Sequence, residues 1–187
     1  MTRWRWALIA FFLPLFGAPS ADYLSIKRKF DLIESEKLRP GSRVMLTSRE
    51  LNAYVATEVT QFAPQGVRDP QLQLGDGSAI GSALIDFLKI RQAGGQQPGW
   101  MMQKLLAGER PVRVTAHIQS GSGQARVDVE RVEISGFAID GRALDFLIKN
   151  FLLPQFPDAQ VGRPFELAHR IDHLEVKPDA VGVVLRR

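Results

Sequence analysis

Metal or acid–base chemistry would depend on the three histidines of the sequence, His117, His169 and His173. The last two are four residues apart, which is the spacing of a zinc-binding pair on a helix. However, the segment 171–176 is typical of a strand, no glutamate lies between the two histidines to act as a base, and no third ligand is evident. His117 alternates with other polar residues on a predicted strand, so simple solvent exposure explains it. We therefore expect no metal site.

Nucleophilic chemistry is suggested by the sequence Gly121-Ser122-Gly123. A nucleophile elbow requires the spacing Gly-x-Ser-x-Gly between a strand and a helix, and this segment does not have it. Asp128 and Glu130 share one face of a predicted strand and could form a carboxylate pair. The arginines that flank this pair, Arg126 and Arg131, favour cross-strand ion pairs instead.

A phosphate-binding loop is suggested by the segment Gly75–Ser78, but this segment lacks the lysine and the following helix that such a loop needs. A tight hairpin turn explains it better. No dinucleotide-binding fingerprint is present, and no basic run interleaves with stacking aromatic residues, so nucleic acid is not an expected partner. We therefore expect a protein that is not an enzyme and uses no cofactor.

The best-marked element is a helix that follows the short alternating run Arg43–Leu46. Thr47 is the expected N-cap, and Glu50 lies three residues on, so the two fit a capping box. Pro64 is expected to end the helix. Apolar residues recur behind the capping box at helical spacing, namely Leu51, Val55, Val59 and Phe62. This apolar face requires a curved or flat surface to pack against.

A shorter amphipathic helix is predicted over residues 23–38, where Tyr23, Ile26, Phe30 and Ile33 have helical spacing. Lys27 and Asp31 have the spacing of an i,i+4 ion pair. The basic run Lys27–Lys29 is either a solvated face or a contact with phospholipid headgroups. The segment Arg39–Ser42 is a predicted turn.

Alternating apolar residues predict antiparallel strands in most of the remaining chain. A hairpin is expected from Pro70–Leu74 and Ser78–Phe87, and Gly81 suggests a bulge or a bend in its second strand. The clearest strand is Pro111–Ser120. Its return strand, Gln124–Ile134, changes phase at Glu130-Arg131, which predicts a β-bulge or strong coiling at that point.

A second long helix is predicted over Gly141–Leu153, with Asp140 as its N-cap and Pro154 after its end. Its apolar stripe includes Leu147, Ile148 and Phe151. The chain is expected to close with a hairpin of residues 171–177 and 181–185 around a turn at 178–180.

The segment Trp100–Leu106 is unusually apolar for a connection between flexible glycine-containing segments, and we expect about two helical turns there. It is either a plug that closes one end of the core or an adaptable lip at the mouth of an apolar cavity, because methionine suits variable apolar contacts. A tip that touches a membrane is a further interpretation. The predicted lip residues are Trp100, Met101 and Leu105.

The N-terminus has the pattern of a targeting segment: Arg3 and Arg5, an apolar run over Ala7–Leu15, and small residues over Gly17–Ala21. The apolar run is short for a membrane span. We expect a signal peptide at residues 1–20 and a single domain at residues 21–187, which would be periplasmic or secreted. The alternative is an inner-membrane protein anchored by an uncleaved N-terminal segment.

Composition is that of an ordinary globular protein, with 45% hydrophobic and 24% charged residues, and argues against disorder. The absence of cysteine excludes disulfides, thiolate metal sites, a cysteine nucleophile and a lipoprotein anchor. The formal net charge of +4 falls to +2 without residues 1–20, which contain two arginines and no acids. Such a charge favours at most a mild attraction to anionic lipid surfaces.

The chain resembles the small bacterial exported proteins of the tubular lipid-binding (TULIP, BPI-like) superfamily. The residues that carry the resemblance are Glu50-Leu51-Asn52 at the helix start and Leu174–Pro178 in the final hairpin, and the likeness covers most of residues 43–187. It implies a strongly curved antiparallel sheet around a long helix, with lipid tails on the concave side and no catalytic residues. The chain departs from that pattern in lacking a lipoprotein cysteine and in the Trp100–Leu106 insert.

We therefore expect an α+β fold, in which a strongly curved, half-barrel-like antiparallel sheet wraps around long amphipathic helices. The expected function is non-catalytic binding or transport of a lipid or other long apolar ligand in the cell envelope. The alternatives are a structural or interaction protein of the envelope with a solid core and no ligand, and a hydrolase with a dispersed site. The predicted ligand-lining residues are Leu51, Val55, Val59, Leu72, Leu74, Val112, Val114, Ile118, Leu147, Ile148 and Phe151.

Overall fold

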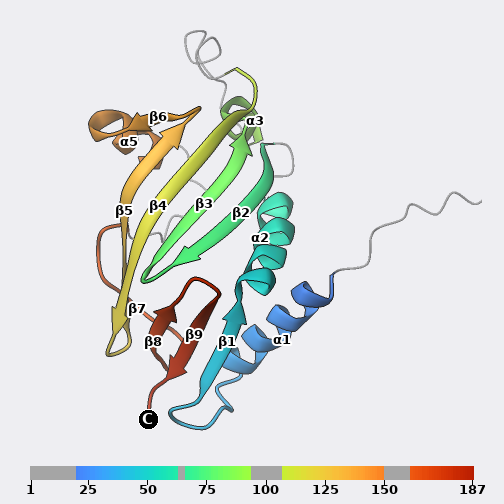
Figure 1. Cartoon of the computed structure of the whole chain (residues 1–187), viewed down its shortest axis with the longest axis vertical. Coiled ribbons are helices and arrows are strands. Elements are labelled where there is room, and N and C mark those ends of the chain that lie inside the picture. Colours follow the sequence, from blue (N-terminus) through green and yellow to red (C-terminus); the bar gives the residue numbers. More distant parts are fainter. Residues whose placement is uncertain (1–19, 63–65, 94–106, 150–160) are drawn as a thin grey trace, which may run out of the picture.

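The computed structural model describes residues 20–62, 66–93, 107–149 and 161–187 (Figure 1). The predicted signal peptide, apart from Ser20, therefore lies outside the described residues, as do Phe151 and the lip residues Trp100, Met101 and Leu105. In chain order the elements are α1 (Ala21–Glu34), β1 (Arg43–Thr47), α2 (Ser48–Phe62), β2 (Val67–Gly75), β3 (Ser78–Ile85), α3 (Phe87–Ala93), β4 (Arg110–Gly121), β5 (Gln124–Ile134), β6 (Phe137–Ile139), α5 (Gly141–Leu147), β7 (Phe165–Glu166), β8 (Ile171–Val176) and β9 (Ala180–Leu185).

The strands form two antiparallel sheets, which confirms the predicted α+β class. The larger sheet is open and has six strands, in the order β2-β3-β4-β5-β6 with β7 also paired to β5. The smaller sheet has the order β1-β9-β8, so that residues 43–47 pair with residues 180–184 from the far end of the chain. Figure 1 shows the small sheet beyond one end of the long strands β2–β5, with α1 beside β1 and α2 beside β2.

The start of α2 confirms the predicted capping box. The amide of Thr47 donates to Glu50 Oε2 over 2.8 Å, and the amide of Glu50 donates to Thr47 Oγ1 over 3.3 Å. One turn into the helix, the side chain of Asn52 forms hydrogen bonds with both backbone polar groups of Leu72 at the edge of the larger sheet. Its Nδ2 donates to the carbonyl oxygen of Leu72, and its Oδ1 accepts from the amide of Leu72. Helix α2 therefore covers part of the exposed edge of strand β2.

Helix α1 ends four residues earlier than the predicted segment 23–38, at Glu34, and begins after the N-cap Ser20, whose hydroxyl accepts from the amide of Tyr23. The basic run Lys27–Lys29 does not form one solvated face. Lys29 Nζ donates to Glu50 Oε2 and to the carbonyl oxygen of Met45, each over 2.7 Å. Only Lys27 and Arg28 of that run are exposed.

The β4–β5 hairpin contains the predicted bulge. Thr115 pairs with Arg131 and Ala116 pairs with Val129, so Glu130 is the extra residue on β5. The bulge brings the two apolar phases of β5 onto one face of the sheet. By contrast, of the bulge or bend predicted at Gly81, the bulge is wrong: Gly81 pairs in register with Leu72 and Val114, and the irregularity of that hairpin lies in β2, between Arg68 and Gln71.

The most deeply buried apolar cluster lies between α1 and the small sheet and consists of Ile26, Ile33, Leu46 and Val183. Leu51, Tyr54 and Leu174 pack against this cluster from α2 and β8. The hydrophobic core therefore sits at one end of the molecule, whereas most apolar side chains on the larger sheet are only partly buried.

Helix α5 confirms the start of the second predicted helix but is shorter in the described part of the chain. It runs from Gly141 to Leu147, with a wider helical turn at residues 148–149. Asp140 occupies the N-cap position, but its side chain makes no capping hydrogen bond, contrary to the role predicted for it. Helices α1, α2, α3 and α5 are each too short or too polar to cross a bilayer.

Candidate functional site

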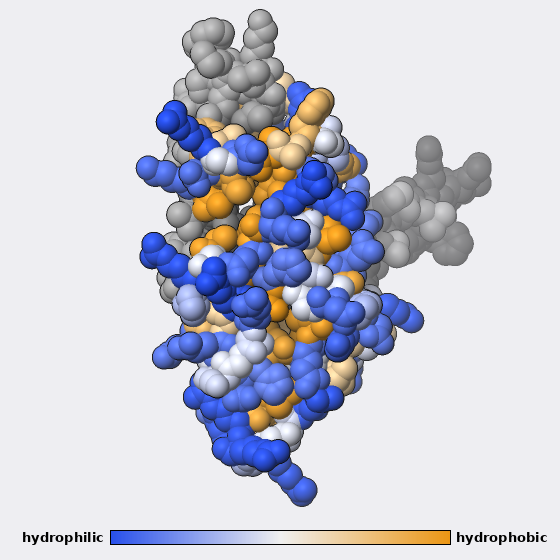
Figure 2. Space-filling view, turned by 60° about the vertical axis from the view of Figure 1, so that its left-hand side comes forward, coloured by the Kyte–Doolittle hydropathy of each residue, from blue (hydrophilic) through white to orange (hydrophobic). Residues whose placement is uncertain are grey.

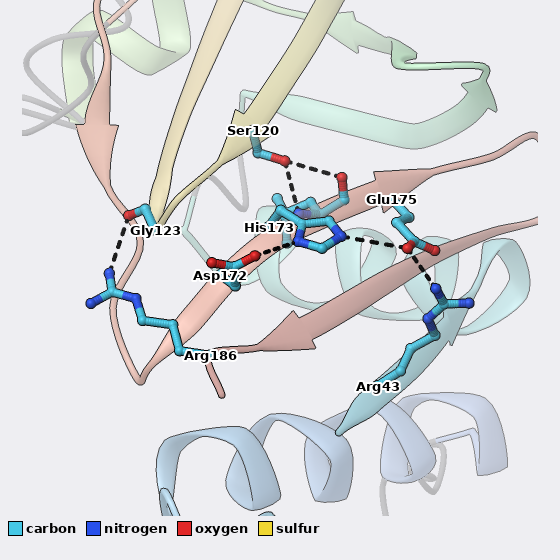
Figure 3. Close-up of polar contacts among 8 residues, drawn as sticks. Arg43, Ser120, Gly123, Asp172, His173, Glu175 and Arg186 are labelled. Atoms are coloured by element: carbon cyan, nitrogen blue, oxygen red, sulfur yellow. Dashed lines mark hydrogen bonds and ion pairs between the residues drawn. The ribbon is translucent and has the colours of Figure 1, made fainter. Parts of the chain in front are cut away.

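Ser120 of β4 lies against β8 at Leu174, the residue after His173 (Figure 3). Ser120 Oγ donates to the carbonyl oxygen of Leu174 over 3.0 Å and accepts from the amide of the same residue over 2.8 Å. Both bonds serve the backbone of β8, which would otherwise present an unpaired edge here. Ser120 therefore joins the two sheets and is not arranged as a nucleophile.

His173 lies between two carboxylates. Its Nδ1 is 2.7 Å from Asp172 Oδ2 and its Nε2 is 3.5 Å from Glu175 Oε1, while Glu175 also pairs with Arg43. The hydrogen bond to Asp172 is the main reason that the pKa of His173 is raised; burial opposes this shift, and Glu175 adds to it. With both ring nitrogens directed at carboxylates, the imidazole has no free lone pair for a serine hydroxyl.

The raised pKa of His173 predicts a contribution to stability that changes with pH. The contribution should be complete below the ordinary histidine pKa of 6.5 and disappear as the pH rises through the raised value of the folded protein, because the folded state holds the proton more tightly. The free energy of unfolding should be measured by urea denaturation below pH 6.5 and above the raised pKa of His173. The difference between the two pH values should be smaller in His173→Gln than in the wild type. An unchanged pH dependence in that variant would contradict the assignment.

Several further titratable side chains of the described ranges form ion pairs at the surface. Asp128 pairs with Arg126 along its own strand, rather than across the sheet as expected, whereas Glu130 approaches His117 across the sheet. His169 approaches Glu36, so the two C-terminal histidines have separate neighbours. No group of three His, Asp or Glu residues within the described part of the chain could hold a metal ion.

The apolar face of the larger sheet contains a hollow of about 240 Å³. The described residues that line it are all apolar, and they come from β4, β5, α5 with the turn after it, and the segment before β7: Val112, Val114, Val129, Val132, Ile134, Leu144, Leu147, Ile148 and Val161. The bulge at Glu130 accounts for this composition, because Val129 and Val132 would point to opposite faces of a regular strand. We call this cavity the apolar hollow.

A second hollow of about 200 Å³ lies towards α2 and shares Val112 and Val114 with the first. Val55 of α2 and Leu72 of β2 also line it, and Gly81 leaves open space where a side chain would otherwise stand. In Figure 2, apolar side chains are visible between polar ones along the molecule and gather in its upper half. The two hollows therefore form adjoining parts of one apolar surface.

The predicted lining residues are distributed over three places. Val112, Val114, Leu147 and Ile148 line the apolar hollow, and Val55 and Leu72 line the hollow beside it. Leu51 instead packs against the core cluster near α1, because it lies on the side of α2 that faces that helix. Val59 and Ile118 are partly buried and Leu74 is buried, but none of the three lines either hollow.

The sequence prediction missed five lining residues: Val129, Val132, Ile134, Leu144 and Val161. The sequence contains signals from which four of these five residues could have been predicted. The phase change at Glu130 marks both halves of β5 as apolar on one face once the bulge is taken into account, and Leu144 belongs to the same helical stripe as Leu147. Val161 carries no such signal, because its position depends on an isolated bridge to Val127.

The opposite face of the same sheet has a depression of about 400 Å³ with a mixed polar and apolar lining. Its lining includes Gln71, Ser82, Arg113 and Glu133, which follow one another across strands β2 to β5. Alternation along the strands thus separates a polar face from an apolar one. The charged residues among its described lining, Asp69, Arg113 and Glu133, are exposed or only partly buried.

Comparisons with models of protein families, with curated proteins and with solved structures gave no match. The structure itself defines the class of the protein: an α+β protein with an open antiparallel sheet and an apolar hollow on one face of this sheet.

Proposed function

We propose that this protein binds, without catalysis, a lipid or another long apolar molecule on the apolar face of its larger sheet. The observation that carries the proposal is that the nine lining residues of the apolar hollow within the described part of the chain are all aliphatic. Ligand sites for apolar molecules are largely hydrophobic with few polar groups. In this proposal the sheet curves around the ligand like a half-barrel, as expected for a member of the tubular lipid-binding superfamily.

The proposal extends to the cellular location. A protein that carries an apolar ligand between membranes would act in the envelope, and residues 1–20 would be the signal peptide that exports it. The ligand would lie along Val112 and Val114, since these two side chains are shared by both hollows. No cofactor is required, because binding of this kind depends on apolar surface alone.

A second candidate function is that of a structural or interaction protein of the envelope that holds no ligand. The observation that favours it is the size of the apolar hollow, about 240 Å³, since pockets for small molecules usually occupy about 300–1,000 Å³. Against it stands the second hollow, which shares Val112 and Val114 with the first and lengthens the apolar surface beyond either volume alone.

Filling the hollow provides the test. In Val114→Phe the larger side chain would occupy space shared by both hollows, and we expect the affinity for a fluorescent fatty acid to fall by about tenfold or more. Thr115→Phe is the matched control, because Thr115 neighbours Val114 but belongs to the opposite face of the sheet. Circular dichroism would establish that both variants fold.

Native mass spectrometry of the purified mature protein supplies an independent readout of bound lipid. Wild-type protein that carries no lipid and takes up no fatty acid would overturn the proposal and favour the second candidate. Equal uptake by wild-type protein and Val114→Phe would place the ligand elsewhere.

A further inference from the structure

Two phenylalanines are exposed at the edge of the apolar hollow. Phe137, the first residue of β6, is 75% exposed, and Phe146 of α5 is 40% exposed. Phe137 pairs with Ile134, which lines the hollow, and Phe146 lies next to Leu147, which also lines it. Because cross-strand partners point to the same side of a sheet, the ring of Phe137 stands on the side of the hollow.

The backbone holds Phe137 in this position. The turn between β5 and β6 consists of Ser135 and Gly136, whose φ angles of 53° and 82° fit a tight hairpin turn. The amide of Ser135 donates to the carbonyl oxygen of Pro111, which fixes the turn to the start of β4. The exposed ring is therefore presented by a paired strand and not by a long loop.

The charges within the segment that carries these rings balance. Between residues 137 and 149 there are two acidic side chains, Asp140 and Asp145, and two basic ones, Arg142 and Lys149. All four are exposed. A surface with exposed aromatic rings and no net charge suits insertion into the boundary of a bilayer better than attraction to an anionic surface.

We propose that the segment 137–149, which we call the β6–α5 corner, docks on a phospholipid bilayer with Phe137 inserted, so that the ligand passes directly between the bilayer and the apolar hollow. This inference rests on the proposed function. A long apolar molecule dissolves poorly in water and is held in membranes, so its uptake requires a contact that avoids the aqueous phase. The corner lies at the opposite end of the long strands from the small sheet (Figure 1).

The test compares Phe137→Ser with Leu24→Ser. Leu24 is 41% exposed on α1, so its substitution removes exposed apolar surface outside the β6–α5 corner. Vesicles of phosphatidylcholine that contain a fluorescent fatty acid serve as the probe. Flotation measures docking, and the rate of fluorescence change measures transfer from the vesicle. The same fatty acid supplied in aqueous solution measures occupation of the hollow alone.

We expect Phe137→Ser to reduce vesicle binding and the transfer rate by roughly tenfold, with little effect of salt and with aqueous uptake unchanged. Leu24→Ser should resemble the wild type. Unaltered docking and transfer in Phe137→Ser would overturn the inference, while aqueous uptake by the wild type would leave the proposed function standing. Docking that requires anionic vesicles and falls in Lys27→Ser would also overturn it, in favour of α1. Failure of the wild type to take up fatty acid from solution would count against the proposed function itself.

Discussion

Replacing Glu50 with alanine is expected to lower the free energy of unfolding by about 3 kcal/mol, because it removes one partner of a buried, hydrogen-bonded ion pair. Glu50 is only 5% exposed. Its carboxylate accepts hydrogen bonds from Lys29 Nζ over 2.7 Å, from Ser25 Oγ over 2.6 Å and from the amide of Thr47 over 2.8 Å. These donors belong to α1 and β1, so one side chain joins three elements.

Urea denaturation of the wild type and Glu50→Ala would measure this effect. Glu34→Ala is the matched control, since Glu34 is exposed at the end of α1 and its replacement should change the free energy of unfolding by less than about 0.5 kcal/mol. Equal losses in the two variants would show that the buried contacts of Glu50 contribute nothing beyond a surface charge.

The same residue predicts how stability depends on acid. Burial alone would raise the pKa of Glu50, but the hydrogen bonds from Lys29, Ser25 and Thr47 lower it from 4.5 to about 2. The folded state therefore binds the proton more weakly than the unfolded state. Roughly 3 kcal/mol of stability should be present above pH 4.5 and should be lost progressively as the pH falls towards 2. Glu50→Gln should be less stable at neutral pH and lack this part of the acid dependence.

The second large effect is expected for Ile26→Ala, which should cost about 2–5 kcal/mol of unfolding free energy. Ile26 is 0% exposed and packs in the core cluster with Ile33, Leu46 and Val183. Its replacement would leave a cavity between α1 and the small sheet. The sheet cannot easily move to fill this cavity, because its central strand β9 is paired on both sides, with β1 and with β8. The measurement is the denaturation midpoint in urea at an unchanged slope.

Leu24→Ala provides the comparison for this prediction, because Leu24 is on the same helix but 41% exposed. The expected change for Leu24→Ala is below about 0.5 kcal/mol. If Ile26→Ala were no more costly than Leu24→Ala, helix α1 would not contribute to the main core.

Local signals in the sequence were sufficient for most elements. The capping box of Thr47 and Glu50 was predicted correctly because its hydrogen bonds join residues only three positions apart. The bulge at Glu130 was predicted because a change of phase within one strand is visible in the order of apolar residues. Gly81 was misinterpreted, since glycine in a strand can mark either a bulge or open space, and here it leaves space beside Leu72.

The two short motifs that carried the family resemblance have clear structural roles. In the first, Glu50 joins α1 to α2, Leu51 packs against the core cluster and Asn52 caps the edge of β2 at Leu72. In the second, the backbone of Leu174 bonds to Ser120, and the carbonyl of Val176 accepts from the amide of Gly77. Both motifs therefore fasten separate elements together, and neither lines the apolar hollow.

Long-range pairing is what the sequence left open. Nothing in the alternation of Arg43–Leu46 indicates that this strand pairs with β9, more than 130 residues away, rather than with a nearer strand. Likewise, Ser120 and Leu174 are 54 residues apart in the sequence and meet only because the β4–β5 hairpin reaches β8. Such contacts depend on the packing of whole elements, and periodicity does not encode which elements meet.

The order of residues by itself determined the α+β class, the positions of the longer strands and the presence of one apolar face on β4 and β5, because these follow from local hydrogen bonding and from alternation. The short strands β6 and β7 were not predicted. The tertiary structure alone decided where apolar side chains fill space. It placed the tightly packed core at α1 and the small sheet and left a hollow over Val112 and Val114, since the volume between elements depends on how their faces are spaced and not on which residues are apolar.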